Sequence, residues 1–200
     1  KMKKKINTFI TILALMLTVN STQAQAWEKN TKVLSFGFGA SQFFHLDNYY
    51  YGNSNNFRSW YWPLTGQINF QGEFGIHKYV GLGFTTGIGG RGGALNGYNG
   101  EINAPIGMLV NFHFYQLIAD KTVKNIHADK LDIYAGANIG SGIAATFYRN
   151  SNNPDALRII PIAFGGLHAG IRYYFKPKVG VNAEIGFGKS LVNAGFVFKL

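Results

Sequence analysis

The chain has no cysteine among its 200 residues. This absence excludes a disulfide scaffold, a cysteine-ligated zinc or iron–sulfur site, a cysteine nucleophile and a lipoprotein anchor on an N-terminal cysteine. Charged residues are also scarce, at 14% of the chain, whereas aromatic residues reach 16%. Low charge with many aromatic residues argues against disorder, and the length indicates one domain.

Long apolar runs are missing after residue 26, so no membrane-spanning helix is expected there. The N-terminus instead has a lysine-rich start, an apolar stretch over 6–19, and Ala24 and Ala26 in a small-x-small arrangement. These features predict a secretory signal peptide over 1–26, with the mature domain over 27–200, and an uncleaved signal anchor is the alternative. The formal net charge of the chain is +10, and four of its lysines lie in this segment. The charge that remains on the mature domain therefore does not favour a nucleic-acid partner.

What the rest of the sequence does contain is alternation of apolar residues with small or polar ones, which predicts β-strands. Within 67–77, Ile68, Phe70, Phe74 and Ile76 fall on one face, and mostly polar residues fall on the other. The phase changes within 159–175, where a β-bulge at Gly165-Gly166 would reconcile the two halves. The eight expected strands are 33–41, 67–77, 80–89, 102–115, 131–143, 159–175, 179–188 and 192–200.

The composition of the two faces predicts which one meets lipid. Glycine, serine and asparagine on the polar face suit the crowded interior of a narrow barrel, so the large apolar residues are expected to face acyl chains. The predicted fold is all-β, an eight-stranded antiparallel up-and-down transmembrane β-barrel. A secreted, soluble, lipocalin-like barrel is the alternative. The orientation requires Phe70, Phe84, Met108 and Ile185 outside, with Asn69 and Glu184 inside.

Connection lengths and aromatic positions indicate the topology. With the N-terminus in the periplasm, the outer connections are the longer ones, except for a tight final turn at Lys189-Ser190 and a long inner link over 116–130. Aromatic residues gather near both ends of the strands, as in membrane interfaces, and Tyr134 and Tyr174 are assigned to the inner girdle.

The C-terminal stretch 170–200, which runs from Gly-Ile-Arg-Tyr-Tyr-Phe to Gly-Phe-Val-Phe-Lys-Leu, resembles the final hairpins of small outer-membrane β-barrel proteins. It is most similar to the outer membrane protein beta-barrel domain families common in Bacteroidota, which include eight-stranded OmpA- and OmpX-like barrels. The resemblance covers 31–200 and implies a cell outer-membrane location, contact with outer-membrane lipid, and handling by the barrel-insertion machinery. Family members often end in Phe, whereas this chain ends in Leu200.

Charged residues on the expected interior face are candidates for a lumen network, because buried charges are costly unless paired. We expect Arg172 to pair with Glu184 or Glu73 and to plug the lumen; the alternative is that each charge is solvated near a rim. The network candidates are Glu73, Arg172, Glu184, Arg91 and Asp132.

The first outer connection combines Tyr, Trp, Asn, Ser and Arg, a composition typical of binding surfaces, although its tryptophans could equally be interfacial anchors. Arg58, Arg91, Arg149 and Arg158 are expected near the outer rim, where guanidinium groups could bind lipopolysaccharide phosphates. Ordinary solvated charges are the alternative. The outer-loop binding candidates are Tyr49, Tyr50, Tyr51, Arg58, Trp60, Trp62, Arg149 and Arg158.

No motif indicates catalysis. Gly81-x-Gly83 lacks a third glycine at residue 86, and Gly188-Lys189-Ser190 is interpreted as a hairpin turn, not a phosphate-binding loop. The histidines have no metal-motif spacing, so neither a metal nor a cofactor is expected. A structural or surface-binding role is therefore predicted, with a narrow pore or a lipid-modifying enzyme using His45 and Ser41 as alternatives. The sequence does not identify an extracellular ligand.

Overall fold

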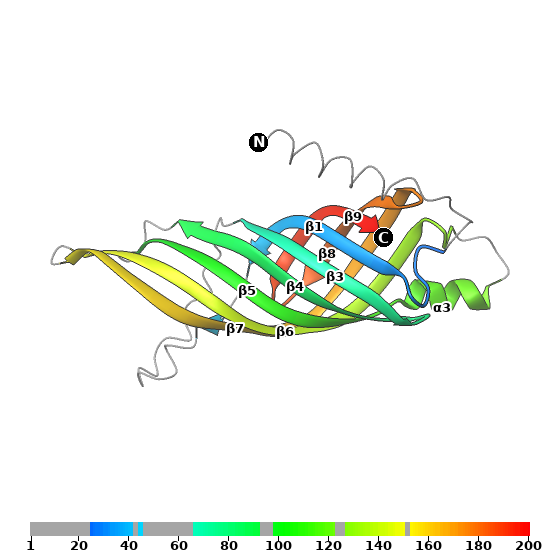
Figure 1. Cartoon of the computed structure of the whole chain (residues 1–200), viewed down its shortest axis with the longest axis horizontal. Helices are drawn as coiled ribbons and strands as arrows, with labels where there is room; N and C mark the ends of the chain where they lie inside the picture. The colour runs from blue at the N-terminus through cyan, green and yellow to red at the C-terminus, as the bar shows by residue number, and fades with distance from the viewer. Residues whose placement is uncertain (1–24, 42–43, 46–65, 93–97, 123–126, 151–152) are drawn as a thin grey trace, which may run out of the picture.

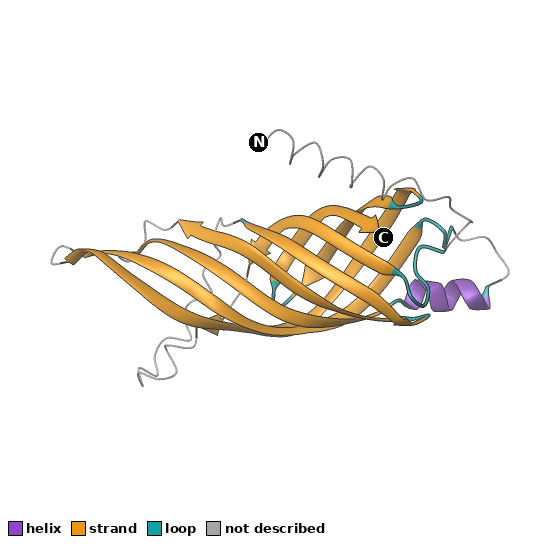
Figure 2. Cartoon of the chain, in the orientation of Figure 1, coloured by secondary structure: helices purple, strands orange, loops and turns teal. Residues whose placement is uncertain are grey.

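The computed structural model describes residues 25–41, 44–45, 66–92, 98–122, 127–150 and 153–200. These residues form an antiparallel barrel with one short helix outside its wall (Figures 1 and 2). The strands are β1 (Lys32–Ser41), β2 (Phe44–His45), β3 (Gln67–His77), β4 (Val80–Gly92), β5 (Tyr98–Phe112), β6 (Leu131–Asn150), β7 (Asn153–Lys176), β8 (Val179–Gly186) and β9 (Ser190–Lys199), and the helix is α3 (Phe114–Lys121).

The ring is closed by hydrogen bonding between consecutive strands. The order β7-β6-β5-β4-β3-β1-β9-β8 returns to β7 through the β7–β8 pairing, which gives eight strands in a ring without an open edge. The β7–β8 pairing ends at His168 of β7. Farther along β7, the two residues of β2 pair with Ile162 and Ala163. The up-and-down topology predicted from the alternation is thus confirmed.

The two ends of the barrel differ. We call the end of the barrel with the β6–β7 connection the loop end. The opposite end, with the tight β3–β4 and β7–β8 turns, is called the turn end. Strands β6 and β7, of 20 and 24 residues, extend farthest toward the loop end, on the left of Figure 1. The β8–β9 hairpin is much shorter, with strands of 8 and 10 residues.

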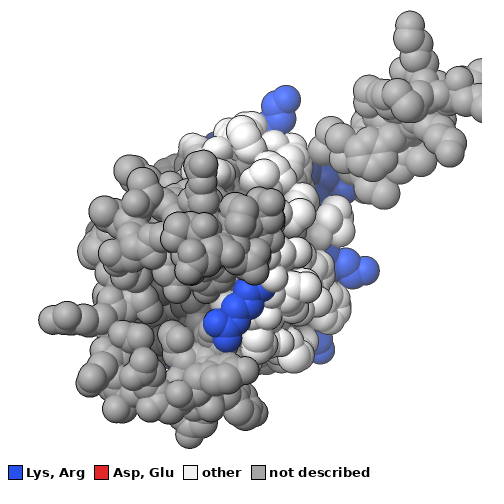
Figure 3. All heavy atoms as spheres, turned by 90° about the vertical axis from the view of Figure 1, so that its left-hand side faces the viewer, with Lys and Arg blue, Asp and Glu red and all other residues white. Residues whose placement is uncertain are grey.

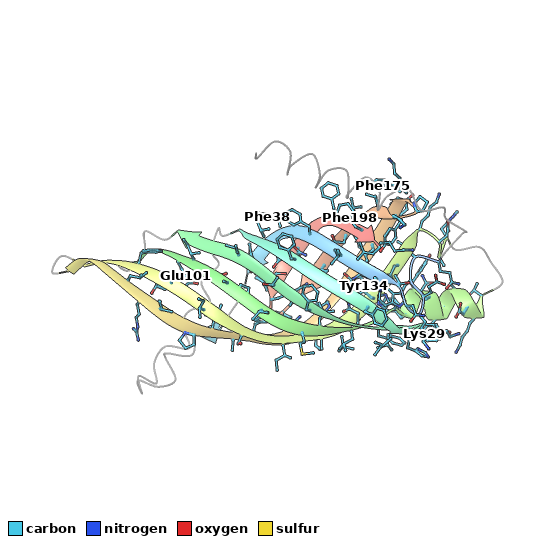
Figure 4. The ribbon with its side chains drawn as sticks, in the orientation of Figure 1. Lys29, Phe38, Glu101, Tyr134, Phe175 and Phe198 are labelled. Atoms are coloured by element: carbon cyan, nitrogen blue, oxygen red, sulfur yellow. The ribbon has the colours of Figure 1, made fainter. Side chains whose placement is uncertain are left out.

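The apolar face points outward, as the sequence predicts. Phe70, Phe84, Met108 and Ile185 are 49%, 51%, 60% and 65% exposed, respectively. Figure 4 shows Phe38 and Phe175 projecting from the outside of the wall in the same way. By contrast, Asn69 and Glu184 on the opposite face are 2% and 3% exposed. A lipocalin-like barrel would have the reverse arrangement, since its apolar residues form the core.

The bulge predicted in 159–175 is absent, and that prediction was wrong. The register of β7 against β6 runs without a shift from Leu157 to Tyr173, so even-numbered residues point inward throughout. Ile160, Ile162 and Phe164 are therefore buried inside the barrel. Space for them comes from β6, where a Cβ on Gly140 would collide with the Phe164 ring.

Two tyrosines assigned to the inner aromatic girdle also lie inside. Tyr134 and Tyr174 are 0% and 2% exposed, because each occupies an inward position on its strand. The long inner link contains α3, which the alternation did not predict. None of the helices among the described residues is long and apolar enough to cross a membrane.

Candidate functional site in the barrel interior

The turn half of the interior is filled by an ionic cluster, which we call the lower cluster: Glu73 on β3, His113 after β5, Asp132 on β6 and Arg172 on β7. The guanidinium of Arg172 contacts both carboxylates, with Nη2 2.5 Å from Glu73 Oε2 and Nη1 3.4 Å from Asp132 Oδ2. All four side chains are at most 1% exposed. Charges so thoroughly removed from water require partners of opposite sign, and this arrangement supplies them.

His113 bridges the same two carboxylates. Its Nδ1 lies 2.8 Å from Asp132 Oδ1, and its Nε2 lies 2.8 Å from Glu73 Oε1. An ionised carboxylate only accepts hydrogen bonds, so both ring nitrogens must donate, and the ring is an imidazolium. The lower cluster then contains two negative and two positive groups and is neutral.

Aromatic rings enclose the lower cluster. The Trp27 indole is parallel to the His113 ring, with centroids 3.6 Å apart and planes 7° apart, and Trp27 is fully buried. The Arg172 guanidinium lies 4.3 Å from the centroid of the Tyr134 ring. Cation–π contacts of this kind add to the stabilisation of the buried positive charge.

A second group, the upper cluster, lies on β3, β6, β8 and the β8–β9 turn and is centred on Glu184. Lys189 Nζ donates to Glu184 Oε2 at 2.7 Å and also to Gln71 Oε1. Tyr134 Oη donates to Glu184 Oε1 at 2.7 Å, and Gln71 Nε2 donates to the same oxygen at 3.2 Å. Tyr134 thus joins the two clusters, and polar contacts extend across the lumen.

Histidine and asparagine extend the upper cluster along the wall. His168 Nε2 lies 2.8 Å from Asn111 Oδ1, and His168 Nδ1 lies 3.0 Å from Asn138 Nδ2. Asn138 Oδ1 accepts from the backbone N–H of Lys189 at 3.3 Å, which holds the turn inward. Gly188 precedes this residue with a φ of 100°, a conformation that allows the turn to fold toward the axis.

The candidates for the lumen network have different positions. Of the two partners considered for Arg172, the structure brings Glu73 into contact and adds Asp132, whereas Glu184 contacts Lys189. The hairpin turn predicted at Gly188-Lys189-Ser190 is present between β8 and β9, but the Lys189 side chain, which was not among the network candidates, is buried inside the barrel at 2% exposure. The backbone of Arg91 lies on β4, but its side chain is outside the described residues.

Of the outer-loop candidates, the structure describes one side chain, that of Arg158. Tyr49, Tyr50, Tyr51, Arg58, Trp60 and Trp62 lie outside the described residues, as do the side chains of Arg149, His45 and Ser41. Arg158 is described and exposed, on the loop-end part of β7. In Figure 3, which views the molecule from this end, Lys and Arg side chains are visible among the described residues, and Asp and Glu side chains are not.

The turn end is covered by two segments that sequence reasoning did not connect. The backbone N–H of Ala26 donates to Ala128 O at 2.7 Å, and Gln116 Nε2 donates to the same oxygen at 3.2 Å. Residues 25–31 and the 113–130 link therefore meet across the mouth of the barrel. Apolar residues at 114, 117 and 118 were an available signal for α3, because they recur at helical spacing.

Helix α3 is also fastened to the β3–β4 turn. Asp120 Oδ2 accepts from Tyr79 Oη at 2.7 Å and from Lys78 Nζ at 3.0 Å. These hydrogen bonds, first from Tyr79 and then from Lys78, hold the pKa of Asp120 below its usual value. The hydrogen bonds with Tyr79 and Asp120 likewise raise the pKa of Lys78. The described residues contain no group of three or more His, Cys, Asp or Glu suited to a metal ion.

The fold is similar to that of solved outer-membrane barrels. The outer membrane protein OprG of Pseudomonas aeruginosa aligns with 10% identity over 90% of this chain and 99% of that chain, with a TM-score of 0.50. The N-terminal β-barrel domain of OprF from the same organism aligns with 14% identity, covers 87% and 99% of the two chains, and has a TM-score of 0.46. Ail, the attachment invasion locus protein of Yersinia pestis, aligns with 12% identity over 86% and 95%, with a TM-score of 0.45.

No family model matches the chain, and no curated protein matches its sequence. The Bacteroidota-type family therefore remains a prediction from the C-terminal resemblance. The likeness to OprG supports the fold, that of an eight-stranded transmembrane β-barrel of the outer-membrane type.

Proposed function

We propose that the protein is exported by its signal peptide, inserted into the outer membrane by the barrel-insertion machinery, and retained there as a non-catalytic barrel with a closed lumen. In this orientation the turn end faces the periplasm, and the loop end faces the outside. Its role is structural or surface-binding, and the ligands are bound by the outer connections.

The observation that carries the proposal is the pair of clusters across the lumen. Arg172 on β7 contacts Glu73 on β3, on the opposite side of the ring. Gln71 on β3 donates to Glu184 on β8, and Trp27 covers the lower cluster from the turn end. An eight-stranded barrel has an interior just wide enough for side chains, so we expect these groups to block a continuous water path. This favours a surface protein over a narrow pore.

Conductance is the direct test of the closed lumen. Purified protein, refolded and shown by heat-modifiable gel migration to be a closed barrel, is added to a planar lipid bilayer. We expect no stable channels. Large, long-lived open channels in the wild-type protein would contradict the proposal and favour the pore.

Location requires a separate measurement. The full chain is expressed in a Gram-negative host, and the membranes are separated by density and washed with carbonate. We expect the protein in the outer-membrane pellet, with its N-terminal segment removed. Release by the wash would show a soluble or peripheral protein, such as the lipocalin-like alternative.

The surface role is tested through the basic residues of the loop end. Arg58, Arg91, Arg149 and Arg158 are changed together to Gln, and binding to lipopolysaccharide is compared with that of wild type. We expect weaker binding, because bidentate guanidinium–phosphate contacts are lost. The matched control changes four exposed turn-end lysines, Lys29, Lys32, Lys121 and Lys130, to Gln. Equal effects of the two sets would remove the assignment.

A lipid-modifying enzyme is the catalytic alternative to this proposal, and it makes its own prediction. A His45→Ala change would alter the lipid A profile of the host if the residue were catalytic. We expect an unchanged profile.

A further inference from the structure

Residues 25–27 are built into the turn end of the barrel, although a signal-peptide cut after Ala26 would remove the first two of them. The backbone N–H of Ala26 donates to Ala128 O at 2.7 Å. The carbonyl oxygen of Gln25 accepts from Lys199 Nζ, also at 2.7 Å. The two residues before Trp27 are therefore bonded both to the link between β5 and β6 and to the end of β9.

Ala26 and Trp27 also pack together with the wall. Both residues are 0% exposed, and they form one buried apolar cluster with Val33, Tyr174 and Val197. The chain continues through Lys29, which Figure 4 shows at the turn end. A chain that begins at Trp27 would lack one member of this cluster as well as the hydrogen bond of Ala26.

The sequence before Trp27 contains two bonds that fit the requirements of a signal peptidase. The enzyme accepts small residues at the first and third positions before the bond. Ala24 and Ala26 meet this rule for a cut after Ala26, and Thr22 and Ala24 meet it for a cut after Ala24. Because the exported chain is cut before the barrel closes, burial does not protect either bond. The structure distinguishes the two products instead.

The two products differ in the position of the new α-ammonium group, which has a pKa of about 8 and is largely charged at neutral pH. A cut after Ala26 places this charge on Trp27, a buried residue whose ring stacks on the lower cluster, and that cluster is already neutral. A buried charge without a partner of opposite sign is costly. A cut after Ala24 places the charge on Gln25, which is exposed and whose side chain hydrogen bonds to Asp120.

We propose that the signal peptide is removed between Ala24 and Gln25, so that the mature chain keeps Gln25 and Ala26 as part of the cover of the mouth at the turn end. One water molecule hydrolyses one peptide bond, which leaves a carboxylate on Ala24 and an ammonium on Gln25. The boundary then lies two residues before the one predicted from the sequence. This inference rests on the export proposed above and adds to it the processing site.

The test is the intact mass of the protein recovered from the outer membrane of a Gram-negative host that expresses the full chain. We expect the mass of residues 25–200. The mass of residues 27–200 would overturn this proposal and leave the export proposal standing. Retention of residues 1–24 would contradict both, so the two failures are distinguishable.

A pair of variants tests the proposed bond directly. Thr22→Asp places a charge at the third position before this bond, so the mass of residues 25–200 is expected to disappear. Gln23→Asp is the matched control, because it adds the same charge at a position that the rule leaves free, and it is expected to be processed as in wild type. An unchanged mature mass in Thr22→Asp would overturn the proposal.

A second experiment tests the role of the two residues without relying on which bond the peptidase selects. A host signal peptide with its own cleavage site is fused directly before Gln25 or directly before Trp27, and each mature protein is unfolded in urea in lipid vesicles. We expect the chain that begins at Trp27 to unfold at a lower urea concentration or to fail to close, because it lacks the hydrogen bond from Ala26 to Ala128.

The control for this experiment is Ala26→Gly in the chain that begins at Gln25. It keeps the backbone hydrogen bond to Ala128 and the exposed position of the ammonium, so its urea midpoint is expected to fall less than that of the shorter chain. Equal urea midpoints for the chains that begin at Gln25 and at Trp27 would overturn the role assigned to the two residues.

Discussion

Removing the Arg172 guanidinium tests whether the lower cluster stabilises the barrel. In Arg172→Met the side-chain volume is roughly kept, but Glu73 and Asp132 lose their contacts at 2.5 and 3.4 Å. His113 remains the single positive group beside two buried carboxylates. Breaking a buried ion pair by removing one partner costs about 3–5 kcal/mol, and the contact with the Tyr134 ring adds about 1 kcal/mol. We therefore expect a loss of about 4–6 kcal/mol in the free energy of unfolding.

The assay is equilibrium unfolding in urea, in lipid vesicles, followed by tryptophan fluorescence and by the fraction of heat-modifiable species. Arg158→Gln serves as the control, because Arg158 is exposed, and its loss is expected to cost at most about 0.5 kcal/mol. The double variant Arg172→Met with Glu73→Gln removes one charge of each sign and should recover part of the loss. A single variant within about 1 kcal/mol of wild type would refute the reasoning, since it would mean that water already screens these charges.

Three other perturbations have expected outcomes. Trp27→Ala removes the ring stacked on the lower cluster and should lower the free energy of unfolding by about 3–5 kcal/mol, measured by urea titration followed on gels. An unchanged urea midpoint of unfolding would show that the ring does not pack in the mouth of the barrel. Hydrogen bonds from Tyr79 and Lys78 lower the pKa of Asp120, so the anchoring of α3 is complete at neutral pH and is lost as the pH falls through that lowered pKa. The amide-exchange protection of residues 114–121, corrected for intrinsic exchange rates, should therefore decrease in acid. A protection factor that does not change with pH would contradict this prediction. Gly140→Val should block closure of the barrel, because the valine side chain would occupy the space of the buried Phe164 ring. Closure is measured by heat-modifiable gel migration.

The outward direction of the apolar face could be predicted because each strand reports it independently. Along β3, Ile68, Phe70 and Phe74 alternate with amide and acidic residues, and only one orientation places both sets in a suitable environment. A one-residue slip would expose every polar group to lipid. The strand order then follows from short connections and the need to close the edge.

The orientation of β7 near the loop end could not be predicted, because both of its faces are apolar there. Ile159 and Ile160 are adjacent, and alternation alone does not tell which one faces lipid. The neighbouring strand decides: Ile160 lies opposite Ala144, and Phe164 lies opposite Gly140, so the small residues of β6 leave room on the inside. A bulge would have left an unpaired backbone group between β6 and β7, whereas the register of these two strands is continuous through this region.

The members of the ionic clusters could be predicted only in part, because alternation gives the inward position of a residue but not its partner. Inward position follows from alternation, which identified Glu73, Glu184 and Arg172. Pairing depends on how far apart residues lie along the axis, and the sequence does not report the stagger of the strands. Lys189 was missed because a turn normally faces water. The signal was present, however, since Glu184 five residues earlier needed a cation and Gly188 allows the turn to fold inward.

The interior has to supply what a hydrophobic core supplies in a soluble barrel. The outward side chains meet lipid in the native barrel, so their burial does not distinguish a closed barrel from an open sheet in the membrane. What distinguishes them is contact across the lumen, such as that between Arg172 on β7 and Glu73 on β3, strands on opposite sides of the ring. Such contacts form only when the ring is complete. The residues that fill the turn half of the lumen are therefore expected to make closure of the barrel cooperative.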